Sequence, residues 1–366
     1  ILDPAAAAAW FHWGYVPTPS TLVRGVRAVS PGEVLLVEAE RLRARRFWTP
    51  GTVVAGPGAT AALRARLEAA ASGGSDRAVV ALSGGRVSSS LAAWRRNLRG
   101  AALTYSRPGL DARDRQESLR MVDEHDLSHQ EAPVEGSPAV RVQAALDAMD
   151  VPLGDPSFVG DVWWAAGLER IVPHAAPVLV GHGGAALVEA PVTERIPQEL
   201  FPSWVTHNET LKTPSRLQRL EAELHRVDRL ATASRRVLRA PFARTELLEA
   251  ADGLSDPVDW HRLARGSVPA RVARRSGSRY APPLDAWMRG PLNRWIEGLF
   301  FGGLSASGLL EAGRLRWVWY QHQLRIRDYG ASLWRLAVIE HWCRSAFSGE
   351  EIRVERRRRR GTSFFA

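Results

Sequence analysis

Two short glycine-rich segments hold the residues of this sequence whose types and spacing could bind phosphate. The first, residues 83–90 (SGGRVSSS), follows a short apolar run and leads into a helical pattern. A strand that ends in glycines before a helix presents backbone N–H groups and hydroxyls at the helix N-terminus, which favours an anion. An ordinary turn followed by a capped helix has the same pattern, so both interpretations stand here. The candidate phosphate-binding residues are Ser83, Gly84, Gly85, Arg86, Ser88 and Ser89.

The second segment, residues 178–184 (VLVGHGG), is another apolar run that ends in glycines. Gly183 and Gly184 are its candidate cofactor-binding residues. His182 lies between the apolar run and these glycines, and it is a candidate catalytic residue because imidazole titrates near neutral pH. A loop histidine without a catalytic role is the alternative interpretation.

Alternating strands and helices are expected to position the two segments. Apolar runs predict strands at residues 77–82, 101–105, 127–134 and 177–181, and helical patterns lie between them at residues 88–98, 113–125 and 139–149. This alternation predicts an α/β fold whose parallel sheet has helices on both faces. Ligands of such sheets bind at the carboxyl ends of the strands, so residues 83–85 and 183–184 should lie side by side.

The rest of the chain is expected to differ from this alternation. The first fifty residues predict short strands and turns, with a strand at residues 34–38. A linker at residues 52–57 and a helix at residues 61–71 precede the sheet. Beyond residue 213 the pattern predicts a mostly helical region, rich in Trp, Leu and Arg.

The composition is that of a globular protein with a substantial core. The chain has 366 residues, of which 45% are hydrophobic and 24% charged. No run of eighteen apolar residues occurs, so no membrane-spanning segment is expected. The single cysteine, Cys343, excludes an intramolecular disulfide and a zinc site built on cysteines, and it favours a cytoplasmic location.

The net charge of +10 comes almost entirely from arginine, because Lys212 is the single lysine. A coding bias explains this composition, and an acidic or phosphorylated partner is the functional alternative. Nucleic acid is not expected, since the basic residues are scattered and no known binding motif occurs. The one arginine cluster, residues 356–360, lies in a C-terminal tail at residues 351–366 that is expected to be solvated.

Several segments, taken in order along the chain, resemble the C-terminal synthetase domain of asparagine synthetases. Residues 83–90 are similar to the SGGxDS pyrophosphate loop of that family, and residues 178–184 to its next strand and GDGGDE loop. Residues 14–17, 31–32 and 46–48 resemble the segment that joins the family's glutaminase and synthetase domains. Further resemblances are residues 152–157 (P-x-x-DPS), 239–242 (R-x-PF), 283–287 (PLDxW) and 333–342 (the closing helix).

The resemblance implies an adenine nucleotide α-hydrolase-like (PP-loop) domain at residues 57–350, preceded by a joining segment at residues 1–56. It implies ATP and Mg²⁺ as cofactors and a small acid or a peptide as substrate. The family includes relatives similar to lasso-peptide cyclases and β-lactam synthetases. In all of them a carboxylate attacks the α-phosphorus of ATP, and an amine then forms the amide. The implied pathway is therefore one of amide or macrolactam formation.

The chain departs from the family where magnesium and phosphate would be held. Val87 stands at the aspartate position of the loop, and Ala185 and Ala186 stand at the two acids of the GGDE motif. Valine and alanine offer no oxygen to a metal, so the resemblance leaves magnesium in doubt and implies no metal ligands here. Other departures are His182 for the aspartate of GDGG, Arg244 for an aspartate, and Gly277, with Arg279 and Tyr280 nearby, for the lysine.

Two interpretations follow from these departures. In the first, the fold survives without magnesium-dependent adenylation and the chain is a binding or partner subunit, for instance beside an intact synthetase. In the second, the chain is an active amide-forming enzyme in which Arg86 and Arg279 neutralise phosphate, with Arg279 as a candidate catalytic residue. The tryptophans allow an aromatic groove for a peptide, although core packing is the simpler role for most of them.

Overall fold

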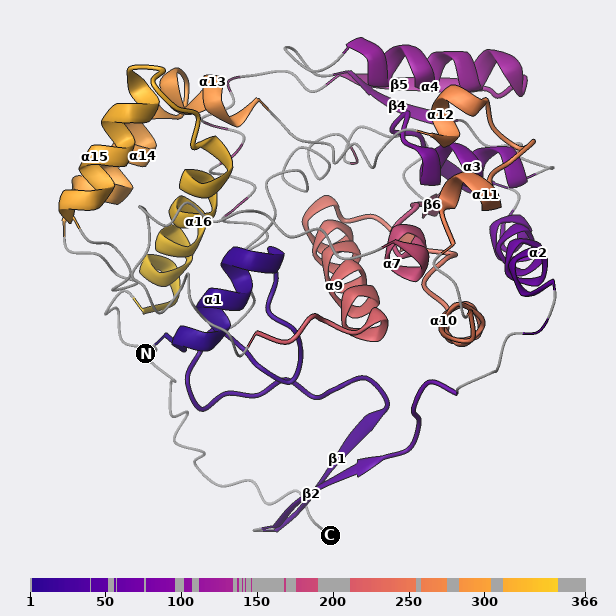
Figure 1. Cartoon of the computed structure of the whole chain (residues 1–366), viewed down its shortest axis with the longest axis horizontal. Coiled ribbons are helices and arrows are strands. Elements are labelled where there is room, and N and C mark those ends of the chain that lie inside the picture. The colour runs from indigo at the N-terminus through magenta and orange to yellow at the C-terminus, as the bar shows by residue number, and fades with distance from the viewer. Residues whose placement is uncertain are drawn as a thin grey trace, which may run out of the picture.

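A parallel sheet of five strands carries both glycine segments in the computed structural model of the chain, and helices surround it (Figure 1). The structure describes residues 2–39, 41–51, 56, 58–75, 77–95, 102–106, 112–133, 137, 140, 142, 146, 168, 176–189, 211–254, 258–274, 283–303 and 312–347. Outside them lie most of the predicted linker at 52–57, most of the predicted helix at 139–149, residues 152–157, Gly277, Arg279, Tyr280 and the tail at 351–366.

The strand order of the sheet places the two glycine segments on neighbouring strands. The order is β5-β4-β3-β6-β7 and every pair is parallel. The strands are β3 (Val79–Ala81), β4 (Ala102–Ser106), β5 (His129–Pro133), β6 (Val178–Leu179) and β7 (Leu238–Arg239). From β3 the chain proceeds outward to β4 and β5, and it then returns to β6 on the other side of β3. The order therefore reverses between β3 and β6, where open parallel sheets bind ligands.

Continuous apolar runs explain why these strands form the centre of the sheet. Residues 78–82 are buried without exception, as are residues 178–180. A strand covered on both faces needs apolar side chains at every position, because successive side chains point to opposite faces. The predicted parallel strands are confirmed, with bounds that differ by a few residues from the expected ones.

Helices cover both faces of the sheet, as the alternation predicts. Ala78, Val80 and Leu82 belong to one apolar cluster, and Val79 and Ala81 belong to the other. The first cluster includes apolar residues of α2 (Ala59–Ser72), α3 (Arg86–Trp94), α4 (Ala112–Glu124), α7 (Gly184–Val188), α10 (Thr245–Asp252), α11 (Trp260–Leu263) and α12 (Ala270–Ala273). The second includes residues of α9 (Arg216–Ser234), α1 (Pro4–Trp13) and the C-terminal helices.

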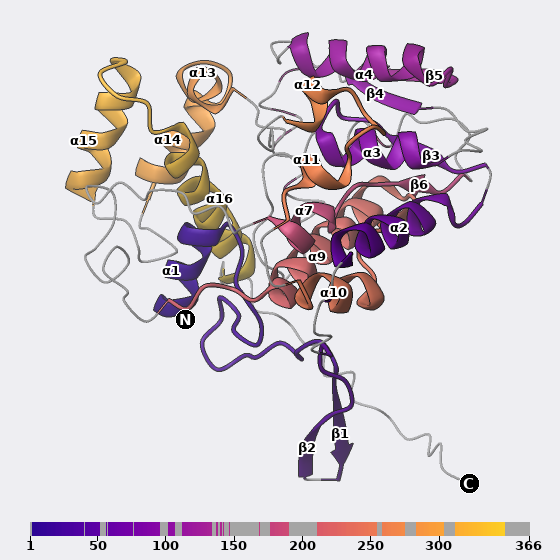
Figure 2. The ribbon, with the colours of Figure 1, turned by 45° about the vertical axis from the view of Figure 1, so that its right-hand side comes forward.

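The C-terminal helices form a lobe beside the sheet, with α16 against α13 and α14 (Figures 1 and 2). These helices are α13 (Leu284–Arg289), α14 (Asn293–Phe301), α15 (Ala312–Gln323) and α16 (Gly330–Phe347). The mostly helical C-terminal region is thereby confirmed in the described residues. Strand β7 was not expected from the sequence; its two residues pair with β6 at the edge of the sheet. Within the described part of the chain, no helix combines the length and the apolar character needed to cross a membrane.

The N-terminal residues form a helix, α1, where short strands and turns were expected, so that expectation was wrong for this segment. Asp3 caps α1, because its Oδ1 accepts a hydrogen bond from the backbone N–H of Ala6 at 3.0 Å. Pro4 occupies the first helical turn, and Gly14 ends the helix with a φ of 78°. Such a cap, first-turn proline and left-handed glycine are typical helix boundaries. Four of its five alanines, residues 6–9, are buried in the core.

A two-stranded hairpin extends from the body of the molecule (Figures 1 and 2). It pairs β1 (Glu33–Glu38) with β2 (Arg41–Arg46) in antiparallel register, from Glu33 opposite Arg46 to Glu38 opposite Arg41. The predicted strand at residues 34–38 is confirmed, whereas β2 was not expected. A strand so rich in arginine lacks the apolar alternation that sequence reasoning uses.

Candidate functional site

The two glycine loops meet at the carboxyl ends of β3 and β6. Val79 pairs with Val178 and Val80 with Leu179, so the loops that follow β3 and β6 leave the sheet at the same edge. A Cβ atom added to Gly184 would lie 2.6 Å from Cγ1 of Val87, and one added to Gly181 would lie 3.0 Å from the same atom. The loops are therefore in van der Waals contact, and the expectation that they lie side by side is confirmed.

Position 84 requires glycine, because the backbone there is left-handed and a neighbouring helix leaves no room for a side chain. Its φ is 72°, and an added Cβ would overlap the backbone carbonyl oxygen of Asp114, in the first turn of α4. A side chain at this position is disfavoured both by the left-handed backbone and by the close approach of α4. The first glycine loop is thus fixed between β3 and α4.

Replacing this glycine should destabilise the fold more than the same change at an open turn. We expect Gly84→Ala to lower the free energy of unfolding by about 2–4 kcal/mol, because strain and overlap add. Gly74→Ala is the matched control, since Gly74 has a φ of 95° with no atom within 4 Å of an added Cβ. The control should lose only about 1–2 kcal/mol. Urea unfolding of both variants measures this, and equal losses would contradict the described approach of α4.

Hydrogen bonds within the first loop occupy the donor and acceptor positions of the Ser88 hydroxyl. Ser88 Oγ donates to the carbonyl oxygen of Gly85 at 3.1 Å and accepts from the backbone N–H of Ser83 at 3.2 Å. The Ser83 hydroxyl lies 3.0 Å from it. A hydroxyl has one donor and two acceptor positions, so these three contacts fill it. A phosphate oxygen would have to displace one of these bonds to reach Ser88.

The next two serines of the segment are fully buried. Ser90 Oγ donates to the carbonyl oxygen of Arg86 at 2.8 Å and accepts from Nε1 of Trp260 at 3.0 Å. Ser89 is 0% exposed, and its hydroxyl has no hydrogen-bond partner among the described residues. The Ser89 side chain is therefore not accessible to a phosphate, so the structure does not support its predicted role in phosphate binding.

Arg86 forms an ion pair with Glu189, which follows α7 beyond the second glycine loop. Both side chains are largely covered, with 12% of Arg86 and 24% of Glu189 exposed. Arg219 of α9 donates from its guanidinium to the backbone carbonyl oxygen of Glu189. Burial raises the pKa of the Glu189 carboxyl, and the Arg86 guanidinium partly offsets that rise. Sequence reasoning did not find Glu189, and no motif signals it.

Val87 and an aromatic cluster fill the contact between the two loops. An added Cβ on Gly184 would lie 2.9 Å from Cη2 of Trp260 and 3.1 Å from Cδ2 of Phe242. The rings of Phe242 and Trp260 are 5.6 Å apart, and Trp94 lies 5.9 Å from each of them. This part of the site is apolar, and hard cations require oxygen ligands. The residues at the loop contact do not fit a magnesium ion.

The remaining candidate residues lie around this contact in different environments. His182 is half-buried at the end of β6, Ala185 is exposed, and Ala186 is buried within α7. Arg244 is exposed at the start of α10, where its Nη2 lies 3.8 Å from the position of an added Cβ on Gly73. Arg279, the other predicted catalytic residue, lies outside the described residues. The roles assigned to His182, Gly183 and Gly184 stay predictions.

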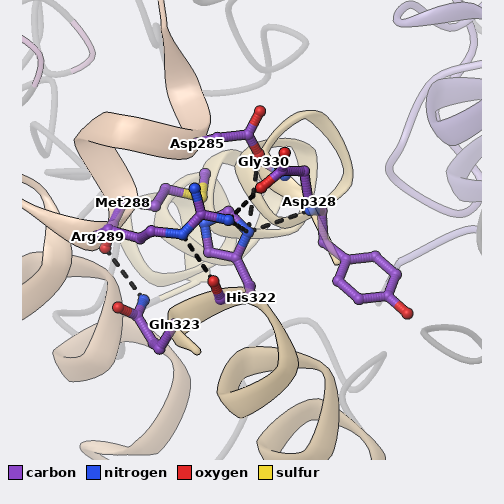
Figure 3. Close-up of polar contacts among 8 residues, drawn as sticks. Asp285, Met288, Arg289, His322, Gln323, Asp328 and Gly330 are labelled. Atoms are coloured by element: carbon purple, nitrogen blue, oxygen red, sulfur yellow. Dashed lines mark hydrogen bonds and ion pairs between the residues drawn. The ribbon is translucent and has the colours of Figure 1, made fainter. Parts of the chain in front are cut away.

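One group of metal-ligating side chains occurs in the described residues, and it lies in the C-terminal lobe rather than at the loops. Asp285, His322 and Asp328 bring their ligand atoms within 4.8 Å of one another. Figure 3 shows that Arg289 reaches into this group, and it forms an ion pair with Asp328. Arg289 Nη2 also lies 3.4 Å from Nδ1 of His322. A guanidinium already supplies the positive charge that a metal would bring.

Backbone N–H groups also contact two ligand atoms of this cluster. Nδ1 of His322 accepts from the N–H of Tyr329 at 3.1 Å, and Oδ1 of Asp285 accepts from the N–H of Gly330 at 2.8 Å. Burial lowers the pKa of the His322 imidazole, and the neighbouring Arg289 lowers it further. The cluster joins α13, α15 and the start of α16, so it stabilises the lobe. Asp285 belongs to the PLDAW segment, and this contact gives it a structural role.

The tryptophans fall into buried and exposed groups. Trp260, Trp287, Trp319 and Trp334 are core residues, which agrees with the simpler of the two expected roles. Trp295 is half-buried, and Trp317 is 50% exposed. Trp163, Trp164 and Trp204, which the sequence also offers for an aromatic groove, lie outside the described residues.

Comparison with known proteins gives one family match. No curated protein matches the chain. The family model described as asparagine synthase matches residues 217–344, which run from α9 to α16 and begin after both glycine loops. The match supports the resemblance of this chain to the asparagine synthetase family. Members of that family use ATP and form amides.

Proposed function

We propose that this chain is an asparagine-synthetase-like protein that does not carry out magnesium-dependent adenylation. It acts as a binding or partner subunit in a pathway that forms an amide or macrolactam on a small acid or peptide. The family match and the position of both loops at the β3–β6 reversal support a PP-loop type of fold. The observation that carries the proposal is the apolar contact of Val87 with Gly181 and Gly184.

This observation matters because adenylation depends on charge near the phosphates. Negative charge develops in the transition state, and magnesium and cationic side chains stabilise it. Val87 packs beside the aromatic cluster at the place where the resemblance implies a metal-binding aspartate. Glu189, the carboxylate that follows α7, is engaged by Arg86. We therefore assign no step of the reaction to a metal at this site.

The alternative, an enzyme with an arginine-based phosphate site, is weakened by the same ion pair. An arginine that neutralises phosphate must offer its guanidinium to the ligand. Arg86 instead contacts Glu189, and breaking this pair would leave a largely buried carboxylate without its partner. Arg86 is thus a poor counter-charge for ATP.

Calorimetric titration with ATP, with and without magnesium, tests the proposal. We expect weak binding whose affinity magnesium does not increase, because Val87 and Ala185 supply no metal ligand. A gain of about tenfold or more, about 1.4 kcal/mol, would mean that other carboxylates hold the ion and would overturn the proposal.

Two arginine variants separate the alternatives in the same titration. Arg86→Ala should leave the affinity for ATP unchanged within about threefold, under 0.7 kcal/mol, if Arg86 serves only the pair with Glu189. Arg216→Ala is the matched control, because Arg216 forms a half-buried ion pair with Asp252, at the end of α10, instead of with Glu189. A loss of about tenfold or more for Arg86→Ala alone would favour the arginine-based enzyme.

A further inference from the structure

Helix α15 has two faces, and one of them has no covering element among the described residues. Its buried face consists of Leu315, Val318, Trp319 and His322, which follow the spacing of one helix side and pack into the lobe. The opposite face carries Trp317 and Tyr320, which are 50% and 63% exposed, and Leu324, which is 69% exposed just after the helix. Ile326 follows at 63% exposed. We call Trp317, Tyr320, Leu324 and Ile326 the α15 surface.

The composition of the α15 surface is that of a binding site. Tryptophan and tyrosine are enriched among the residues that contribute most to protein interfaces. Among the described tryptophans only Trp317 is exposed, since the others are buried or half-buried. Its neighbour on the same helix side, Gly313, has no atom within 4 Å of an added Cβ. The surface is therefore open at its N-terminal end, and contiguous exposed apolar groups of this kind mark interaction sites.

Arginines surround the α15 surface and give it a positive charge. Arg314 and Arg316 lie on either side of the apolar stripe at helical spacing, and Arg325 and Arg327 flank Ile326. The guanidinium of Arg316 lies over the ring of Phe301 at 5.7 Å, and that of Arg327 over the ring of Tyr329 at 5.1 Å. These contacts hold two of the arginines at the edge of the surface.

Two acidic residues of the lobe have partners other than these arginines. Asp328 is ion-paired with Arg289, as Figure 3 shows. Glu297 accepts a hydrogen bond from Nε1 of Trp319, on the buried face of α15, at 3.2 Å. A partner with carboxylates around an apolar stripe matches both parts of the surface, because guanidinium groups bind carboxylates in two-point contacts. A second copy of this chain fits less well, since the net charge of +10 disfavours self-association.

We infer that the α15 surface docks an acidic amphipathic helix of a partner protein. The apolar face of that helix packs on Trp317, Tyr320 and Leu324, and its flanking carboxylates contact the arginines. This mode of binding is common for amphipathic helices. In both views α15 lies at the outer edge of the C-terminal lobe, away from β3 and β6 (Figures 1 and 2). The docking surface is therefore separate from the glycine loops, and the inference stands whether or not they bind nucleotide.

A designed probe tests this inference on the full chain. The probe is a fluorescein-labelled helical peptide of about 18 residues, roughly five turns, with leucines on one face and glutamates elsewhere. Fluorescence anisotropy should show binding that weakens as salt increases. The same peptide with lysine in place of every glutamate should bind at least about tenfold more weakly, because the arginines repel it.

Variants assign the binding to the α15 surface. The double substitution Trp317→Ala and Tyr320→Ala should weaken binding by about tenfold or more, since aromatic anchors contribute most of the affinity. Phe47→Ala is the matched control, because Phe47 is an aromatic residue of similar exposure, 69%, beside the hairpin. It should change binding by less than about twofold. Thermal unfolding checks that all variants fold.

Three results with the peptides would overturn the inference. The first is no binding of the acidic peptide at its highest soluble concentration, the second is binding that the double variant retains, and the third is equal binding of the lysine peptide. Binding of anionic lipid vesicles, or self-association of the chain, in place of peptide binding would also overturn it, because the α15 surface would then serve a lipid surface or a second copy.

Discussion

Replacing Trp260 with alanine is expected to remove about 3–5 kcal/mol of stability, which is typical for a large aromatic residue deleted from a core. Trp260 is 0% exposed and contacts the rings of Trp94 and Phe242. Its Nε1 also donates to Ser90 Oγ at 3.0 Å. The substitution removes these contacts together and leaves a cavity next to Gly184.

The matched control is Trp317→Ala, which removes the same side chain from the exposed face of α15. This variant should change the free energy of unfolding by less than about 0.5 kcal/mol. Equilibrium unfolding in urea compares the two variants with the parent chain. A loss below about 1 kcal/mol for Trp260→Ala would contradict the packing described between the glycine loops and α11.

The sequence predicts those parts of the fold that strong local patterns determine. The residues around β3 and β6 are apolar at every position and are followed by glycines, so both the strands and the adjacency of their loops could be predicted. The parallel arrangement follows from the alternation with helices such as α3 and α4. The helix α3 begins at Arg86 and ends at Trp94, several residues before the predicted end at residue 98. Helix ends are less well determined by pattern than helix centres.

The missed elements have weak or unusual patterns. The alanine-rich α1 is buried almost all round, so it lacks the apolar stripe by which an amphipathic helix is recognised. Its signals were the cap residue Asp3, Pro4 and Gly14. Strand β7 has only two residues, Leu238 and Arg239, between two helices. Pairing with β6, rather than its own sequence, determines that strand.

The candidate site was predictable in position but not in its contacts. The glycine loops follow from the sequence, whereas the ion pair of Arg86 with Glu189 joins residues that are distant in the chain. Val87 was identified as a lost ligand, and the structure adds that it packs against Gly184 and the aromatic cluster. Restoring an acid at Ala186 would also place a carboxylate at a buried position of α7, where desolvation disfavours its charged form.

Pyrophosphate release by the purified chain is expected to be at or near background. Removing one donor that stabilises transition-state charge commonly costs about a hundredfold in rate. The resemblance implies that both metal-binding acids and a lysine are replaced here, and Arg86 is held by Glu189. Since these groups act on the same developing charge, their losses do not multiply. The remaining rate should nevertheless be too low to sustain turnover.

Val87→Asp, Ala185→Asp and Ala186→Glu together should not restore the reaction. The lysine position and Arg244 would still differ from the family, and Arg86 would still contact Glu189. Combining this triple variant with Glu189→Gln releases Arg86, and it is the most favourable background in which to look for recovered activity.

The most direct test is pyrophosphate release from ATP and magnesium with a panel of amino acids, dicarboxylic acids and short peptides. The purified chain is measured alone and then with any genetically linked synthetase. We expect background release by the chain alone, with turnover only when an intact synthetase is added. Robust turnover by the isolated chain, abolished by Arg86→Ala or Arg279→Ala, would instead establish an arginine-based enzyme.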